Sequence, residues 1–216
     1  MRILALSDIH GAYKTMRKIL EAESSVDMIV LAGDLTTRGS DADLTVVLES
    51  ALSLKKPILS ILGNMDPPAL EPTLESSGTS LSGNATVISG VGFVGVSASP
   101  YSPLHTPNEV PDESLGASAE KGWSGLPPLR WNILVSHTPP FGTTTDRVHS
   151  GAHVGSPALR RFVERRQPDA VLCGHIHEAR GIDWIGKSQI VNCGPAFEGS
   201  YAILETGSEL TIRMVP

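Results

Sequence analysis

The feature that most constrains the fold is a series of short apolar runs, each followed directly by a carboxylate, amide or imidazole side chain. Met28 to Ala32 contains no polar residue, and Gly33-Asp34 comes straight after it. A run of this length without polar alternation is typical of a β-strand that is covered on both faces. Because the chain repeats this pattern, we predict an α/β protein whose strands deliver polar residues to a common edge.

Helical patterns separate the first of these strands. Apolar residues recur at helical spacing over 12–22 and 40–55, between strands expected at 2–6, 28–32 and 57–62. Strands that alternate with helices are typical of βαβ units. Ser156 followed by Pro157 predicts a further helix that runs to about 167. The remaining strands are expected at 85–89, 91–97, 132–136, 170–173, 181–185, 189–192, 201–204 and 210–215, with the first two antiparallel.

One long segment, residues 98–130, is rich in proline, serine and glycine and has no sustained periodicity. We therefore predict an irregular excursion, and a structureless stretch of this length is usually functional. We expect it to form part of a rim that selects a substrate. Asp66, which precedes Pro67-Pro68, is expected to cap a helix. Since no repeat or domain-length linker interrupts the chain, residues 1–216 are predicted to form a single domain.

Composition and charge narrow the partners of the protein. The chain has 216 residues, 40% of them hydrophobic, and a formal net charge of -6. This charge argues against nucleic acid, because proteins that bind it usually cluster lysine and arginine. No apolar run is long enough for a signal peptide or a membrane span, so we expect a cytoplasmic protein with no membrane partner. The two cysteines, Cys173 and Cys193, form no paired motif and are interpreted as buried thiols.

The candidate metal ligands are centred on Gly174-His175-Ile176-His177, where two imidazoles one residue apart follow an apolar run. Alternate side chains of extended backbone share a face, so the pair can chelate an ion. On its own, such a pair more often consists of surface or core histidines, and only ligands from elsewhere favour a metal site. The other strand ends supply carboxylate, amide and imidazole groups, which suit Mn²⁺, Fe or Zn²⁺. The candidate set is Asp8, His10, Asp34, Asn64, His137, His175 and His177.

The order of these motifs closely resembles that of the calcineurin-like metallophosphoesterase superfamily. The motifs are Asp8-x-His10, Gly33-Asp34, Gly63-Asn64, His137 and Gly174-His175-x-His177. The resemblance spans nearly the whole chain and implies a four-layer α/β/β/α sandwich of two mixed β-sheets flanked by helices. It also implies two divalent ions, with Mn²⁺ preferred and Fe, Zn²⁺ or Ni²⁺ as alternatives. One ion would be held by Asp8, His10, Asp34 and His177, and the other by Asp34, Asn64, His137 and His175, so that Asp34 bridges them.

A narrower resemblance links residues 153–156, 174–181 and 191–195 to the small prokaryotic phosphoesterases of this superfamily. Many family members have a histidine where this chain has Met65, and that histidine commonly acts as a general acid or stabilises charge. His153 is the other candidate for proton donation. We predict that Asn64, His153 and Ser156 bind the substrate, with Ser156 at a helix N-terminus that can receive an anion.

Phosphoester hydrolysis is the reaction that this ligand set favours. Two divalent ions about 3.5 to 4 Å apart can polarise a phosphate and hold a bridging hydroxide as the nucleophile. We predict Asp34, Asn64 and His153 as catalytic residues acting on a small phosphoester, with a phosphodiester favoured over a monoester. One alternative is a non-catalytic metal-binding scaffold of the same fold. Another is a structural site with one metal, which carboxylate and asparagine ligands disfavour.

Overall fold

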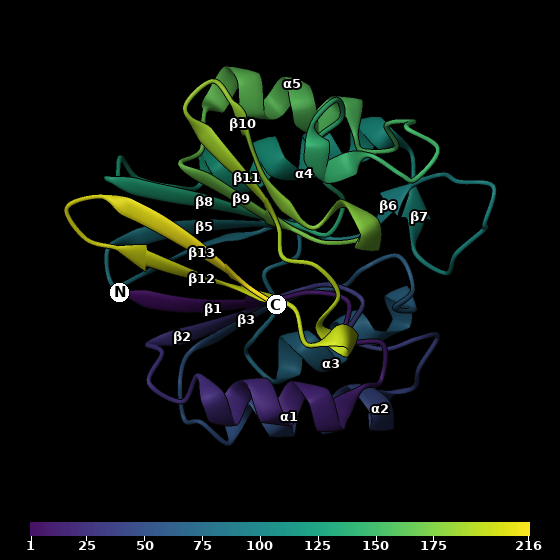
Figure 1. Ribbon diagram of the computed structural model, residues 1–216, viewed down its shortest axis with the longest axis vertical. Coiled ribbons are helices and arrows are strands. Elements are labelled where there is room, and N and C mark those ends of the chain that lie inside the picture. Colours follow the sequence, from purple (N-terminus) through teal and green to yellow (C-terminus); the bar gives the residue numbers. More distant parts are fainter.

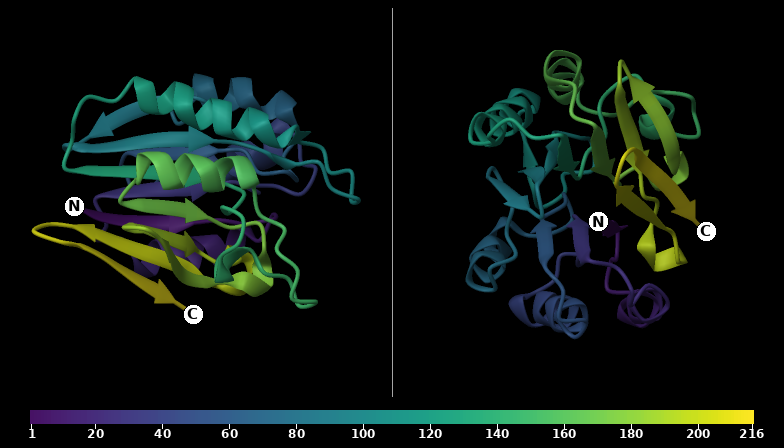
Figure 2. Two further views of the ribbon diagram at one scale, coloured as in Figure 1. Left: turned by 90° about the horizontal axis from the view of Figure 1, so that it is seen from above. Right: turned by 90° about the vertical axis from the view of Figure 1, so that its left-hand side faces the viewer.

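Two β-sheets packed face to face form the centre of the protein in the computed structural model, which describes residues 1–216 (Figures 1 and 2). Helices cover the outer face of each sheet, so the right-hand view of Figure 2 shows the layers as helices, sheet, sheet and helices. This arrangement confirms the predicted four-layer α/β/β/α sandwich of two mixed β-sheets.

The first sheet joins three N-terminal strands to a C-terminal hairpin. Its strands are Arg2–Leu6 (β1), Met28–Ala32 (β2), Ile58–Ile61 (β3), Tyr201–Thr206 (β12) and Leu210–Val215 (β13). The order is β13-β12-β1-β2-β3, in which β1, β2 and β3 are parallel and β12 is antiparallel to both neighbours. The helices Tyr13–Ala22 (α1), Asp41–Leu52 (α2) and Glu71–Ser76 (α3) pack on its outer face.

The second sheet has four parallel strands between two antiparallel edges. Its strands are Ala85–Ile88 (β4), Val91–Val96 (β5), Trp131–Ser136 (β8), Ala170–Cys173 (β9), Gly181–Ile185 (β10) and Ser188–Asn192 (β11). The order is β10-β11-β9-β8-β5-β4, and the predicted antiparallel pairing of β4 with β5 is confirmed. The helices Asp112–Ser124 (α4) and Pro157–Arg166 (α5) cover this sheet (Figure 1).

The remaining elements are short. Two-residue strands Ser99–Pro100 (β6) and Glu109–Val110 (β7) pair with each other. Single turns of 3₁₀ helix span Pro68–Leu70 (η1), Thr144–Asp146 (η2), His177–Ala179 (η3) and Ala196–Glu198 (η4). None of the helices combines the length and the apolar composition that crossing a bilayer would require.

Alternation along the strands explains why each sheet is apolar on both faces. In β1, Ile3 and Ala5 face the second sheet, whereas Leu4 and Leu6 face the core beneath the helices. Successive side chains of a strand point to opposite faces, so a continuous apolar run fills two cores at once. Three hydrophobic cores result: one between the sheets, and one between each sheet and its helices.

Residues 98–130 are not the irregular excursion that we predicted, because they contain α4. Leu115, Ala119 and Gly122 form the buried side of this helix, and Gly116 packs closely against Ala158 of α5. Two of these four positions are glycine, which lowers helix propensity and contributes no apolar side chain. Because small residues occupy much of its buried side, this helix lacks the apolar periodicity that would have predicted it.

The prediction that Asp66 caps a helix is also wrong. Its carboxylate accepts backbone hydrogen bonds from Leu35 and Gly63 at 3.0 and 2.9 Å, and from Thr36 at 2.7 Å. Asp66 thus ties the loop after β2 to the loop after β3. The turn that follows it, η1, has Pro67 at its N-cap and no side-chain cap.

Ser156 caps α5 as predicted, with help from α4. Its hydroxyl accepts the Leu159 N–H at 3.0 Å and donates to Asp112, whose other carboxylate oxygen accepts the Ala158 N–H at 2.9 Å. Two donors of the first turn of α5 are therefore satisfied inside the protein. The same bonds join the starts of the two helices.

Replacement of Asp112 by alanine should lower the free energy of unfolding by about 1 to 2 kcal/mol, because it removes one acceptor for a helix N–H and another for a buried hydroxyl. Urea denaturation measures the change. Glu113→Ala is the matched control, since Glu113 makes only a surface ion pair with Arg161. Equal destabilisation by both substitutions would contradict the capping role of Asp112.

Candidate metal centre

Parallel strands bring the candidate ligands to one edge of the two sheets. In the first sheet, β1, β2 and β3 are followed by Asp8, Asp34 and Asn64, and in the second, β8 and β9 are followed by His137 and His175. Carboxyl ends of parallel strands share an edge, which is where α/β proteins bind ligands. The sheets are stacked so that residues from both meet there.

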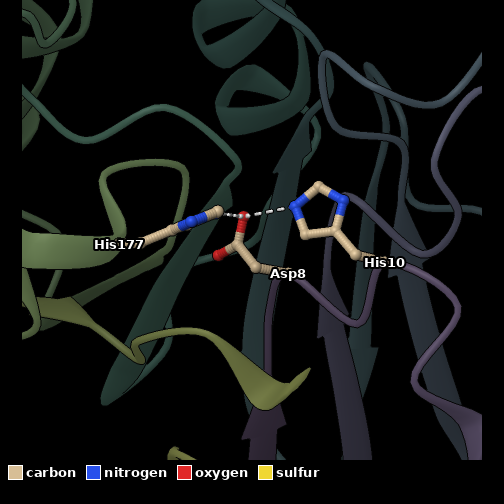
Figure 3. Close-up of side chains that lie close together, drawn as sticks. All are labelled: Asp8, His10 and His177. Carbon is tan, nitrogen blue, oxygen red and sulfur yellow. Dashed lines mark hydrogen bonds and ion pairs between the residues drawn. The ribbon is translucent and has the colours of Figure 1, made fainter. Parts of the chain in front are cut away.

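Asp8, His10 and His177 form the first of two groups whose ligand atoms all lie within 4.8 Å of one another. Figure 3 shows the two imidazoles approaching the Asp8 carboxylate from opposite sides. Oδ1 of Asp8 lies 3.3 Å from Nε2 of His177 and 3.8 Å from Nε2 of His10. Asp8 is completely buried, and the Phe197 ring packs edge-on against both histidines.

Asp8, Asp34 and His137 form the second group. Oδ2 of Asp34 lies 3.3 Å from Nε2 of His137 and 3.5 Å from Nε2 of His10. Asn64 joins this group, because its Oδ1 lies 2.9 Å from Nε2 of His137. Asp34 therefore contacts a histidine of each group, which is the position that a bridging ligand requires.

His175 borders these groups without belonging to either. Its ring centre lies 5.0 Å from that of His137, and its backbone N–H donates to Oδ2 of Asp8 at 3.0 Å. The structure thus gathers all seven predicted ligands around two buried carboxylates, with His175 on the side of a neighbouring cavity.

Close backbone approach makes this cluster possible. A Cβ atom at Gly174 would collide with Asp8, and one at Gly63 would collide with Asp34. Left-handed backbone is uncommon outside glycine and concentrates at functional sites. Four of the candidate ligands have it, with φ values of 55°, 49°, 51° and 69° for Asp8, His10, Asp34 and His175.

The histidine nitrogens that face the carboxylates are placed to bind a cation. Nδ1 of His10 lies 2.9 Å from the Thr37 hydroxyl, whereas its Nε2 is buried without any hydrogen-bond partner. Nδ1 of His137 donates to the Ala32 carbonyl oxygen at 3.0 Å, which directs Nε2 toward Asp34. A buried nitrogen without a partner is unfavourable, and a cation between it and the carboxylates would satisfy it. The donor set therefore fits divalent metal ions.

Protonation of His137 balances the charge of the cluster without metal. Burial alone would lower the pKa of His137, but the Asp34 and Asp8 carboxylates raise it to about 9. Burial alone would raise the pKa of Asp8, but His177 and His137 hold it at about 2. Burial, with repulsion from His137, lowers the pKa of His175 to about 4. A metal ion would have to displace the proton of His137.

A cavity of about 490 Å³ opens beside the cluster. Asn64 and His175 line it together with Tyr101, Leu104 and Val154. Tyr101 and Leu104 belong to the predicted rim segment, although no residue of α4 reaches the cavity. The prediction named the rim segment as a whole and neither of these two residues, and it did not include Val154, whose only signal was a turn-rich composition around it.

The structure does not support two of the predicted substrate-binding residues. Ser156 is completely buried, and Asp112 and Leu159 already use its hydroxyl. Nδ1 of His153 donates to the Asp146 carboxylate at 2.7 Å, and the ring packs on Phe141. Successive side chains of extended backbone face opposite ways, and His153 does not line the cavity that its neighbour Val154 lines.

Comparisons with known proteins match most of this chain. A family model described as calcineurin-like phosphoesterase matches residues 1–179. An uncharacterized protein of Methanocaldococcus jannaschii is 31% identical over 98% of this chain and 95% of its own length. The 3',5'-cyclic adenosine monophosphate phosphodiesterase CpdA of Escherichia coli is 25% identical over 87% of this chain and 73% of its own. A crystal structure from Thermus thermophilus shares the fold, with TM-score 0.73 and 21% identity over 98% of this chain and 97% of that one.

Metal-free protein should be most stable near pH 6.5. The pKa of His137 is raised from 6.5 to about 9, so its protonated form stabilises the folded state. This stabilisation is complete below pH 6.5 and is lost as the pH rises to 9. The His175 pKa, lowered to about 4, makes stability fall as the pH drops from 6.5 to 4. Each change amounts to about 2 to 4 kcal/mol, and urea denaturation in chelator measures it. A free energy of unfolding that rose from pH 6.5 to 9 would contradict the protonation of His137. In His137→Gln, the decrease in stability between pH 6.5 and 9 should be smaller.

His153→Ala should change kcat and KM by less than about twofold, because the side chain does not line the cavity and is hydrogen-bonded to Asp146. A positioned general acid typically contributes about 10² to 10⁴ in rate. Steady-state kinetics on activated phosphodiesters measures the effect. A loss of about a hundredfold would show that His153 reaches the substrate.

Proposed function

Because the chain belongs to the calcineurin-like phosphoesterase family, we propose that it hydrolyses small phosphodiesters with two divalent metal ions. The observation that carries this proposal is the convergence of the candidate ligands on two buried carboxylates, beside a buried histidine nitrogen without a partner. We propose Mn²⁺ as the bound ion, with Fe, Zn²⁺ or Ni²⁺ as alternatives, because oxygen and imidazole donors suit these metals.

Each ion would have its own set of ligands, with one residue shared. The contacts of Asp34 with both His10 and His137 support Asp34 as the bridge. His177 and Asp8 would complete the site of His10, because the ligand atoms of these three residues all lie within 4.8 Å of one another. Asn64 and His175 would complete the site of His137.

Residues of the chain would orient the substrate at this centre. The ions, when bound, would polarise the phosphate and supply water of lowered pKa as the nucleophile. Asn64 turns its carbonyl oxygen toward His137, so its amide NH₂ group can donate to a phosphate oxygen in the cavity. The Thr37 hydroxyl and the Ala32 carbonyl would keep the His10 and His137 rings in place.

The preference for a diester has two supports. By its name, the relative CpdA is a phosphodiesterase. Met65 replaces the histidine that many relatives use to donate a proton. Its backbone N–H donates a hydrogen bond to Oδ1 of Asp34 at 2.7 Å. No carboxylate, lysine or arginine lines the cavity to replace that donor. We therefore propose that substrates with leaving groups that depart readily as anions are turned over best.

A non-catalytic metal-binding scaffold is the alternative function. It requires the same ligands and would bind metal without turnover. The cavity beside His175 and Asn64 favours the enzyme, because a scaffold needs no space for a substrate next to its ions.

Asp34→Asn and His175→Ala should each lower hydrolysis of bis(p-nitrophenyl) phosphate by at least about a hundredfold, since both would weaken the metal centre. Asp41→Asn, at an exposed position at the start of α2, is the matched control and should keep its activity. Metal analysis should find two ions in each wild-type chain. No more than one ion in metal-replete protein would contradict the two-metal site, and two ions without turnover would favour the scaffold.

A further inference from the structure

Exposed apolar side chains gather at the cavity beside the candidate metal centre. Tyr101 is 70% exposed, Leu104 77% and Val154 41%. All three line the cavity that also contains Asn64 and His175. Scattered exposed apolar residues are ordinary, but a group of them around one hollow marks a binding surface. The catalytic roles proposed above use none of these three side chains.

Glu109 fixes the shape of the wall that carries Tyr101 and Leu104. Its carboxylate accepts the N–H and hydroxyl of Ser102 at 3.1 and 2.7 Å, and those of Thr106 at 2.9 and 2.7 Å. Partial burial would raise the pKa of Glu109, but these hydrogen bonds hold it at about 2. The carboxylate therefore stays ionised at neutral pH, and the loop between β6 and β7, which projects from the body in Figure 1, is ordered before any ligand binds.

Asn108 connects this wall to the loop of the candidate metal ligand Asn64. Its side-chain amide donates to the Gly63 carbonyl oxygen, and its backbone N–H donates to that of Asn64, both at 3.0 Å. The apolar wall and the phosphate-facing amide of Asn64 are thus held at a fixed separation. A rigid cavity of this kind can select by the size of a substituent.

The charge around the cavity favours substrates with only one negative charge. No lysine or arginine lines it, and Glu109 adds an anionic group behind the wall. A second phosphate or a carboxylate on the substrate would move out of water into the cavity and would find no cationic partner there. Burial of an unpaired charge is unfavourable. The metal centre alone would compensate the charge of the ligand.

We propose that this cavity selects phosphodiesters with a single negative charge that carry a bulky apolar or aromatic substituent packed on Tyr101, Leu104 and Val154. The inference rests on the proposed function, because it places the phosphate at the metal centre beside Asn64 and His175. It adds the class of substrate that the family alone does not specify.

Phosphinates with two carbon–phosphorus bonds test the cavity without hydrolysis, because they carry one negative charge and no ester. Metal-loaded protein is titrated calorimetrically with methyl(2-naphthyl)phosphinate, with dimethylphosphinate, and with the naphthyl compound bearing a sulfonate on its distal ring. We expect the naphthyl compound to bind at least about tenfold tighter than the dimethyl compound. The added sulfonate should remove most of that gain.

Variants assign the preference to the wall. The double substitution Tyr101→Ser with Leu104→Ser should reduce the naphthyl preference to below about threefold and leave the affinity for dimethylphosphinate unchanged. Both side chains are exposed, so the fold should tolerate the change, and thermal unfolding checks this. Trp184→Ser is the matched control, because Trp184 is 56% exposed on β10 and does not line the cavity.

Equal affinity of wild-type protein for the two uncharged-ring phosphinates would overturn the proposal, as would a naphthyl preference that persists in the double variant. Failure of metal-loaded protein to bind any phosphinate would also overturn it. Hydrolysis of bis(p-nitrophenyl) phosphate is measured separately. A normal naphthyl preference without turnover would reject the proposed phosphodiesterase activity and retain the cavity as a site for apolar monoanions.

Discussion

The buried carboxylate of Asp8 joins the two sheets at the edge where the candidate ligands lie. It follows β1 of the first sheet and accepts the His175 N–H from the loop after β9 of the second. The backbone N–H of Asp8 donates to the carbonyl oxygen of Gly33, and the backbone carbonyl oxygen of Asp8 accepts the N–H of Phe197. Loss of a partner by a buried carboxylate is costly, so these loops cannot shift independently. Asp8 therefore links loops that carry candidate ligands from both sheets.

The sheet edge at which the candidate ligands meet could be predicted, because short stretches of sequence determine the strands and the polar residues that follow them. Runs such as Met28–Ala32 are apolar throughout since each side chain enters one of two cores, and this is visible without knowledge of the partner strands. Each candidate ligand follows such a run within a few residues. Parallel strands place Asp34 and His137 at the same edge of their own sheets, and the stacking of the two sheets brings them together.

What could not be predicted depends on distant partners. The hydroxyl of Ser156 donates to Asp112, which lies 44 positions earlier in the chain. The sequence around the helix start therefore predicts a free anion site that does not exist. Gly116 fits α4 against Ala158, and the fit is a property of the pair rather than of either residue. The hydrogen bond of His153 to Asp146 likewise could not be predicted, because Asp146 ends η2 and no helix or strand contains both residues.

The place of β1 in the first sheet has a consequence for biosynthesis. β1 is a central strand, with Ile3 opposite Met28 of β2 on one side and opposite Leu204 of β12 on the other. While the chain emerges from the ribosome, β2 can cover one side early, but the other stays open until residues 201–206 have been made. An apolar strand with an open side readily joins other chains. The nascent protein therefore carries an unfinished sheet until β12 has been made, and chaperones that shield strand edges would act on β1 until the hairpin of β12 and β13 arrives.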